Sequence, residues 1–173
     1  MDLRIVKTQN RIIEAFLNLR DKMTPEKIKV KDICEAAMIN KTTFYKHYAD
    51  SIELSNEIEE SAIEKVMSAI KTKCNILTQP REYISELIGA LESESSHLRI
   101  VFKGKKETLA TKLADKLIDM SGNADNGANN DLRISFAIGG VVRVVNDFLF
   151  TNKNFDTELL TLQTITMLES IPF

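Results

Sequence analysis

The 173-residue chain is poor in the residues that build catalytic, metal and disulfide sites. It has two cysteines, two histidines, six glycines, three prolines and no tryptophan. Cys34 and Cys74 lie 40 positions apart without a CxxC spacing, which predicts buried, reduced thiols rather than a disulfide or a metal site. We find no glycine-rich phosphate loop, Ser–His–acid arrangement or metal cluster, so we expect a protein that is not an enzyme and needs no cofactor.

Long apolar runs are missing as well. The longest covers residues 136–142, is followed by Arg143, and is far shorter than the ~20 residues that a membrane-spanning helix needs. The first ten residues lack the apolar core of a signal peptide, so we expect a cytoplasmic protein with no membrane partner. The content of 43% hydrophobic and 28% charged residues predicts a folded globular chain rather than a disordered one.

Negative charge is scarce at the front of the chain, and no acidic residue lies between Asn40 and Tyr48. Residues 1–48 hold ten Lys/Arg and six Asp/Glu, a balance of +4, whereas the remaining 125 residues have a balance of −6. This asymmetry indicates that only the front meets a polyanion, although imbalances of this size also arise by chance. The clustered carboxylates Glu57, Glu59 and Glu60 are interpreted as a solvated helix face.

Helical periodicity runs through nearly the whole chain. Ile12, Ala15, Phe16 and Leu19 repeat at i, i+3, i+4 and i+7, and they predict a first helix over about residues 3–22. Further helices are predicted over about 30–37, 41–48, 51–74, 80–91, 95–102, 109–121, 131–151 and 156–170, with Asn40 as an N-cap, Asp50 and Glu53 as a capping box, and Gly122 as a C-cap. No strand is recognisable, so we predict an all-α fold of about nine helices.

Residues 30–48 predict two short helices joined by a tight turn, and the second of them is cationic and rich in hydroxyl groups. Such a helix, held against an apolar one, is typical of proteins that contact the DNA major groove. Phe44 and Tyr48 lie four positions apart and are expected to point into the core, which leaves Tyr45 pointing outward.

These three helices resemble the DNA-binding domain of the TetR (tetracycline-repressor) family of bacterial regulators. The residues that carry the resemblance are Ile12, Ile13, Ala15 and Phe16 in the first helix, Val30, Asp32, Ile33, Cys34 and Ala37 in the second, Thr43, Phe44, Tyr45 and Tyr48 in the third, and Leu54 beyond them. The match covers about the first 55 residues, and beyond them only the order of helices agrees.

The resemblance implies a helix-turn-helix DNA-binding domain over residues 1–50 and a larger helical effector-binding and dimerisation domain over residues 51–173. It further implies a homodimeric, sequence-specific transcriptional regulator, most simply a repressor that binds a pseudo-palindromic operator of double-stranded DNA and responds to a small-molecule effector.

The predicted site residues fall into three groups, with no metal site among them. Lys29, Lys41, Lys46 and His47 are expected to contact phosphates together with the Tyr45 hydroxyl, and Thr42 and Thr43 either touch bases or only occupy a first helical turn. Met67, Tyr83, His97 and Phe102, with Arg99, are candidates for lining an effector cavity, although core or surface packing is the commoner role of each. Gly139, Gly140, Val144, Phe148, Leu162 and Ile165 are the predicted dimer contacts, because the eighth helix is apolar on nearly every side.

Three positions depart from the family pattern. Met38 lies where the turn usually has glycine, Ser51 where a phosphate-binding lysine is common, and Lys29 where a small hydroxyl residue caps the second helix. A left-handed backbone at Met38 is expected to cost about 1 kcal/mol. An alternative therefore stays open: a coactivator of the same fold that acts mainly through protein–protein contact, with weak or no DNA binding.

Overall fold

The computed structural model describes residues 3–71, 76, 78–121, 128–151 and 156–170. Over these residues the helices are α1 (Leu3–Arg20), α2 (Val30–Ala37), α3 (Lys41–Phe44), α4 (Ser51–Ala69), α5 (Pro80–Ser93), α6 (Ser95–Val101), α7 (Lys106–Ser121), α8 (Ala128–Phe150) and α9 (Thr157–Glu169), with a short 3-10 helix, η1 (Pro25–Lys27). No strand occurs among the described residues, and the all-α prediction is confirmed. None of the described helices is long and apolar enough to span a membrane.

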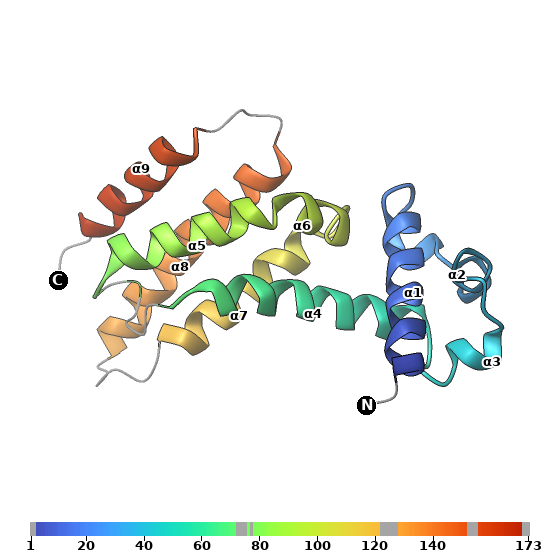
Figure 1. The fold of residues 1–173 in the computed structure, drawn as a ribbon. Coiled ribbons are helices and arrows are strands. Elements are labelled where there is room, and N and C mark those ends of the chain that lie inside the picture. The colour runs from blue at the N-terminus through green and yellow to red at the C-terminus, as the bar shows by residue number, and fades with distance from the viewer. Residues whose placement is uncertain (1–2, 72–75, 77, 122–127, 152–155, 171–173) are drawn as a thin grey trace. The chain divides into compact units, whose positions relative to one another are not determined.

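The chain divides into two compact units that share two helices (Figure 1). The first unit consists of Met1–Ala62 together with Ile100–Gly104, and the second of Ile63–Arg99 and Lys105–Phe173. One boundary therefore lies inside α4 and another inside α6.

The first unit is built from α1, α2, α3 and the beginning of α4. The predicted apolar positions form its core, because Ile12, Phe16, Ile33 and Phe44 are almost fully buried. α1 packs against α2, and α2 packs against α3. The predicted capping box opens α4, in a form shifted by one residue: Asp50 Oδ1 accepts the backbone N–H groups of the second and third helical residues, both at 2.8 Å, and the Glu53 carboxylate accepts the N–H of Ala49.

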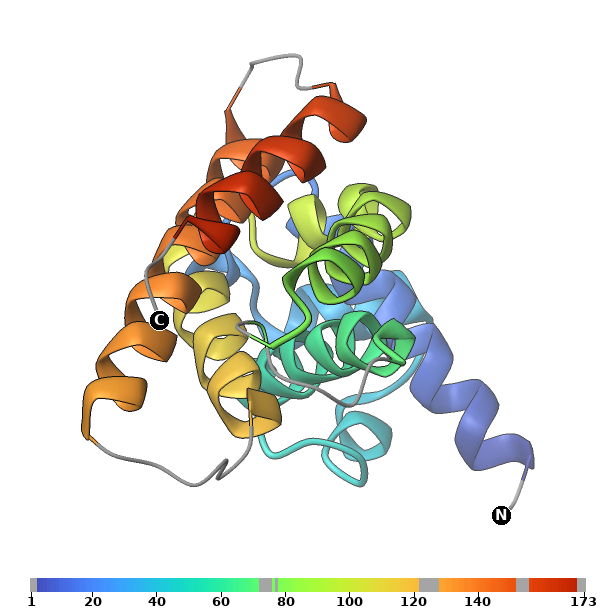
Figure 2. The ribbon, with the colours of Figure 1, turned by 90° about the vertical axis from the view of Figure 1, so that its left-hand side faces the viewer.

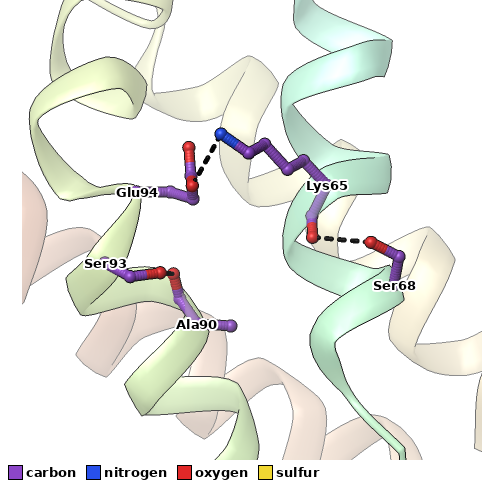
Figure 3. Close-up of polar contacts among 5 residues, drawn as sticks. All are labelled: Lys65, Ser68, Ala90, Ser93 and Glu94. Atoms are coloured by element: carbon purple, nitrogen blue, oxygen red, sulfur yellow. Dashed lines mark hydrogen bonds and ion pairs between the residues drawn. The ribbon is translucent and has the colours of Figure 1, made fainter.

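In the second unit α7 packs against α8, and α5 packs against α9. Figure 2 shows α9 alongside α8, and side chains of α5, α8 and α9 surround one small apolar cavity. The later part of α4 is joined to the end of α5 by an ion pair between Lys65 Nζ and Glu94 Oε1, at 2.8 Å (Figure 3). The apolar stripes of α5 and α7 are buried, as their periodicity predicts.

Two predicted helix ends differ from the structure. α4 ends at Ala69 rather than near Cys74, because the Lys71 N–H is bound by the Glu86 carboxylate at 2.7 Å and not by a helical carbonyl. α3 is only four residues long, although the helical hydrogen bond from the Tyr48 N–H to the Phe44 carbonyl, at 3.0 Å, continues its last turn. The predictions made for Cys74 and Gly122 lie outside the described residues.

The turn between α2 and α3 has the left-handed backbone expected at the departure from glycine. Met38 has φ 51° and ψ 50°, and its side chain is 82% exposed. The Ile39 N–H donates to the Cys34 carbonyl at 3.0 Å, and the Arg11 guanidinium donates to the carbonyls of Ala37 and Met38. The end of α2 is therefore well capped, at the cost of a strained methionine backbone.

We predict that Met38→Gly stabilises the protein by about 0.5–1 kcal/mol, because glycine adopts positive φ without strain and little side-chain packing is lost. Urea unfolding at equilibrium measures the change. In the matched control Ala36→Gly, glycine replaces an exposed residue inside α2, and a loss of about 0.5–1 kcal/mol is expected. A destabilised Met38→Gly variant would show instead that the methionine side chain makes stabilising contacts.

Candidate nucleic-acid interface

The candidate interface centres on residues 40–48, which we call the recognition segment. Its helix starts as predicted, because Asn40 Oδ1 accepts the Thr43 N–H at 2.7 Å. The Thr43 hydroxyl also donates to Asn40 Oδ1, at 2.9 Å, and the side chain is half-buried. Of the two threonines, Thr43 thus takes part in the cap, while Thr42 is exposed and available for contact.

Aromatic residues divide the recognition segment into a buried and an exposed face. Phe44 is fully buried, Tyr48 is nearly so, and their ring centroids are 5.9 Å apart. Tyr45 is 55% exposed, and its ring meets Phe44 edge to face at 5.6 Å. Tyr45 therefore points outward, as the spacing predicts, and its ring packs against the buried ring of Phe44.

A hydrogen-bonded group fixes the end of the recognition segment to α1 and α4. The Tyr48 hydroxyl donates to Glu57 Oε1 at 3.1 Å, and Gln9 Nε2 donates to the same oxygen at 3.0 Å and to the Tyr48 oxygen at 3.2 Å. Burial raises the pKa of Tyr48 to about 12, and the Glu57 carboxylate adds to this rise, so the phenol stays neutral.

The carboxylates of α4 that were interpreted as a solvated face divide by exposure. Glu57 is exposed, as predicted, and also accepts the Tyr48 hydroxyl, and Glu60 is half-buried. Glu59 is almost fully buried and accepts the Ser55 hydroxyl at 2.9 Å, so for this residue the interpretation is wrong. A run of acidic residues at helical spacing does not show which of them turns toward the core.

The predicted DNA contacts all lie in the first unit, and most are open to solvent. The exposed ones are Lys29, Lys41, Thr42, Tyr45 and Lys46, while Thr43 and His47 are half-buried. The recognition segment contains no carboxylate, whereas Lys31 on α2 forms an exposed ion pair with Glu35 at 3.6 Å. The segment therefore offers cations and hydroxyl groups that a polyanion can engage.

The start of α4 is less suited to binding an anion than a helix N-terminus usually is. A helix N-terminus usually attracts anions through its free N–H groups. Here the N–H groups of Ile52 and Glu53 are both taken by the Asp50 carboxylate, and Ser51 brings no charge. The capping box was recognisable in the sequence. Because its Asp50 carboxylate binds the first free N–H groups of α4, these groups are no longer available to an anion.

Among the predicted effector residues, Tyr83 stands out. It is fully buried on α5, and its hydroxyl has no hydrogen-bond partner among the described residues. Burial raises its pKa to about 12. A buried hydroxyl without a partner is costly, and a polar atom of a bound molecule is one way to satisfy it.

The other predicted effector residues lie on different elements from Tyr83. Met67 is buried on α4 and His97 is half-buried on α6, beside the pair of Lys65 and Glu94, whereas Phe102 belongs to the first unit. Burial lowers the pKa of His97, and the positive charge of Lys65 lowers it further. The negative charge of Glu94 acts in the opposite direction. No group of three or more His, Cys, Asp or Glu side chains among the described residues is placed to hold a metal ion.

The predicted dimer residues on α8 and α9 divide by exposure. Gly139, Gly140 and Leu162 are exposed, Val144 and Phe148 are half-buried, and Ile165 is buried within its own unit. The large exposed apolar residues that the sequence analysis missed are Leu132, Phe136, Leu159 and Met167. A groove of about 310 Å³ lies between the two helices, lined by Phe136, Ala137, Gly140, Val141, Val144, Thr164, Met167 and Leu168. Periodicity alone could not find these residues, because a helix that is apolar on every side gives no sign of which side stays open.

Comparison with solved structures identifies the fold. The fatty acid degradation regulator FadR from Bacillus halodurans matches with a TM-score of 0.57 and 15% sequence identity, over 94% of this chain and 95% of that chain. The TetR family repressor AlkX from Dietzia sp. strain DQ12-45-1b matches with a TM-score of 0.39 and 15% identity, over 92% and 93%. No protein-family profile and no curated protein matches the sequence. The helix order, the helix-turn-helix at its front and the likeness along nearly the whole chain show that this protein has a TetR-like fold.

Proposed function

We propose that the protein is a homodimeric, DNA-binding transcriptional regulator, most simply a repressor that releases its operator when a small molecule binds. One observation carries the proposal: an acid-free, cationic segment is presented outward on a buried aromatic base. Lys41, Tyr45 and Lys46 are exposed, while Phe44 and Tyr48 are held in the core directly beneath them.

This arrangement suits duplex DNA for two reasons. Lysine and tyrosine side chains on one short helix bind phosphate oxygens and so set its register on the backbone, while Thr42 and Lys41 are placed to reach base edges. Two copies related by a dimer axis would then occupy adjacent major grooves about 34–36 Å apart, as helix-turn-helix dimers do.

We predict that Lys41→Ala weakens binding to duplex DNA from the region that flanks the protein's own gene. It should lower the slope of log affinity against log salt concentration by about 1, because one fewer phosphate is neutralised. Tyr45→Phe should also weaken binding, through the lost hydroxyl contact. Fluorescence anisotropy titrations at several salt concentrations measure both effects.

The matched control for this experiment is Lys31→Ala, which removes an exposed lysine of the same unit that is paired with Glu35. Its effect on affinity should be clearly smaller. If Lys41→Ala and Tyr45→Phe leave affinity and salt slope unchanged, the recognition segment is not the DNA-binding surface.

A coactivator of the same fold is the second candidate function, and the start of α4 favours it. The Asp50 carboxylate occupies N–H groups that would otherwise attract a phosphate, and Ser51 stands at the position where a phosphate-binding lysine is common. Under this alternative the wild-type protein would bind no duplex even in dilute buffer, so the same salt titration separates the two.

The homodimer is supported by an uncharged surface on the second unit. The exposed side chains of α9 over residues 159–167 are Leu159, Leu162, Gln163, Thr166 and Met167, none of which is charged, and on α8 the exposed residues from Leu132 to Gly140 carry no charge either. Contiguous exposed apolar surface with a polar rim is typical of a protein interface. A Cβ at Gly139 or Gly140 would have no atom within 4 Å, so another backbone has room to approach there.

We predict that Phe136→Asp converts the dimer to a monomer. Phe136 is 73% exposed, so the substitution should spare the fold of the subunit while placing an unpaired charge in each half of the interface. Analytical ultracentrifugation should show a dimer dissociation constant raised by ~100-fold or more, as expected for a buried unpaired charge.

The control is Ile118→Asp, which places the same charge at an exposed apolar position of α7 and should leave the dimer intact. A Phe136→Asp variant that associates like the wild type would show that α8 does not form the interface.

Effector binding is supported by the unpartnered Tyr83 hydroxyl. We predict that Tyr83→Phe raises the free energy of unfolding by about 1 kcal/mol in protein refolded without small molecules, because it removes a buried polar group that has no partner. Urea unfolding measures the effect. Tyr48→Phe is the matched control, since its hydroxyl is bonded to Glu57 and its loss should destabilise by about 1 kcal/mol. A Tyr83→Phe variant that is destabilised to the same degree would mean that the hydroxyl already has a partner in the folded chain and is not vacant for an effector.

A further inference from the structure

Arg20, the last residue of α1, is fully buried in the first unit. One terminal nitrogen of its guanidinium donates to the Val101 carbonyl at 2.7 Å and to the Lys103 carbonyl at 2.9 Å. The other donates to the Met23 carbonyl at 3.5 Å. The side chain at the end of α1 therefore caps the C-terminal end of α6, which lies more than eighty residues later in the sequence.

The same guanidinium has an electrostatic partner on α4. Burial lowers the pKa of Arg20, and the carboxylate of Glu59 opposes this as the larger of two favourable charges. Glu59 is itself almost fully buried and accepts the Ser55 hydroxyl at 2.9 Å. A buried cation is tolerated only where charge and carbonyl oxygens surround it, so Arg20 depends on α4 and on the end of α6 at the same time.

Lys103, just after α6, makes a corresponding contact with the end of α1. The Lys103 ammonium group donates to the carbonyl of Asp21, the residue that follows α1. Each of the two helices, α1 and α6, thus has its C-terminal carbonyls bound by a cation that comes from the end of the other. Positive charge is favourable at both places, because the C-terminus of a helix carries partial negative charge.

The position of Arg20 matters because of how the units are connected. The chain passes between the units inside α4, after Ala62, and inside α6, after Arg99. Glu59 lies on α4 one turn before the first crossing, and Val101 lies on α6 two residues after the second. Arg20 therefore binds the end of α6 close to one crossing and interacts electrostatically with a carboxylate of α4 close to the other.

We propose that Arg20 is a positioning residue that couples the state of the second unit to the recognition segment; this inference rests on the proposed function. A change in the second unit that shifts α6 relative to α4 must be accommodated at Arg20, which binds the end of α6 and interacts electrostatically with Glu59 of α4. From Arg20 the change passes along α1 to Gln9, which is bonded to Tyr48 at the end of the recognition segment. A lysine at position 20 keeps the charge but lacks the planar fork of donors that binds several oxygens at once.

Binding free energies are reciprocal, so the coupling can be measured from the DNA side without an identified effector. If the second unit alters DNA affinity, a bound duplex must alter the second unit. The probe is a duplex from the region that flanks the gene, and the readout is amide hydrogen exchange of peptides from residues 95–99 of α6 and from α7.

In the wild-type protein the duplex should slow this exchange by about threefold or more, a linkage of ordinary allosteric size. In Arg20→Lys the slowing should be lost, while the affinity for the duplex stays within about threefold of wild type, since Arg20 is buried away from any DNA. A purely structural role would lower protection with and without DNA and would leave the DNA-dependent difference in place.

Arg11→Lys is the matched control, because Arg11 is also an α1 arginine that binds carbonyls at a helix end, but those of α2. It should retain the slowing. Lys103→Met is the second variant, decisive if Arg20→Lys does not fold, because Lys103 is exposed and its loss should still weaken the slowing. DNA-dependent slowing equal to wild type in both Arg20→Lys and Lys103→Met overturns the coupling role alone. A wild-type protein that binds no duplex overturns the proposed function and this inference with it.

Discussion

A helix of four residues has no stability of its own in water, so the recognition segment exists only because Phe44 and Tyr48 are buried beneath it. Their burial fixes the direction of Tyr45, Lys41 and Lys46, and the bond from Tyr48 to Glu57 joins the segment to α4. The proposed DNA binding and its regulation both depend on this contact. DNA binding needs the exposed face that it creates, and regulation needs the connection to α4.

Buried polar groups have opposite meanings in the two units. In the first unit the terminal nitrogens of Arg20 donate to three carbonyl oxygens and its charge is favoured by the Glu59 carboxylate, so its burial adds specificity to the way α1, α4 and the end of α6 meet. In the second unit the Tyr83 hydroxyl is buried and has no hydrogen-bond partner in the part of the chain that the structure describes, which stores a small cost in the folded chain. Under the proposed function, the first arrangement couples the two units and the second leaves a polar atom for an effector to satisfy.

The two proposed interfaces rely on different physical forces. The recognition segment is cationic and polar around a buried aromatic base, as suits a polyanion whose binding weakens as salt rises. The exposed residues of α8 from Leu132 to Gly140 and of α9 over residues 159–167 include Phe136, Leu162 and Met167 and no charged residue, as suits a second copy of the same surface.

The sequence by itself determined the helices, the Asn40 cap, the inward Phe44 and Tyr48 and the outward Tyr45, because these depend on local periodicity and side-chain chemistry within one or two turns. It also pointed to the left-handed backbone at Met38. Only the tertiary structure decided that Arg20 and Glu59 are buried, that Ile165 is covered, and that Phe136 and Met167 are open. The physical reason is that exposure depends on which distant helix covers a given face, and no local pattern carries that information.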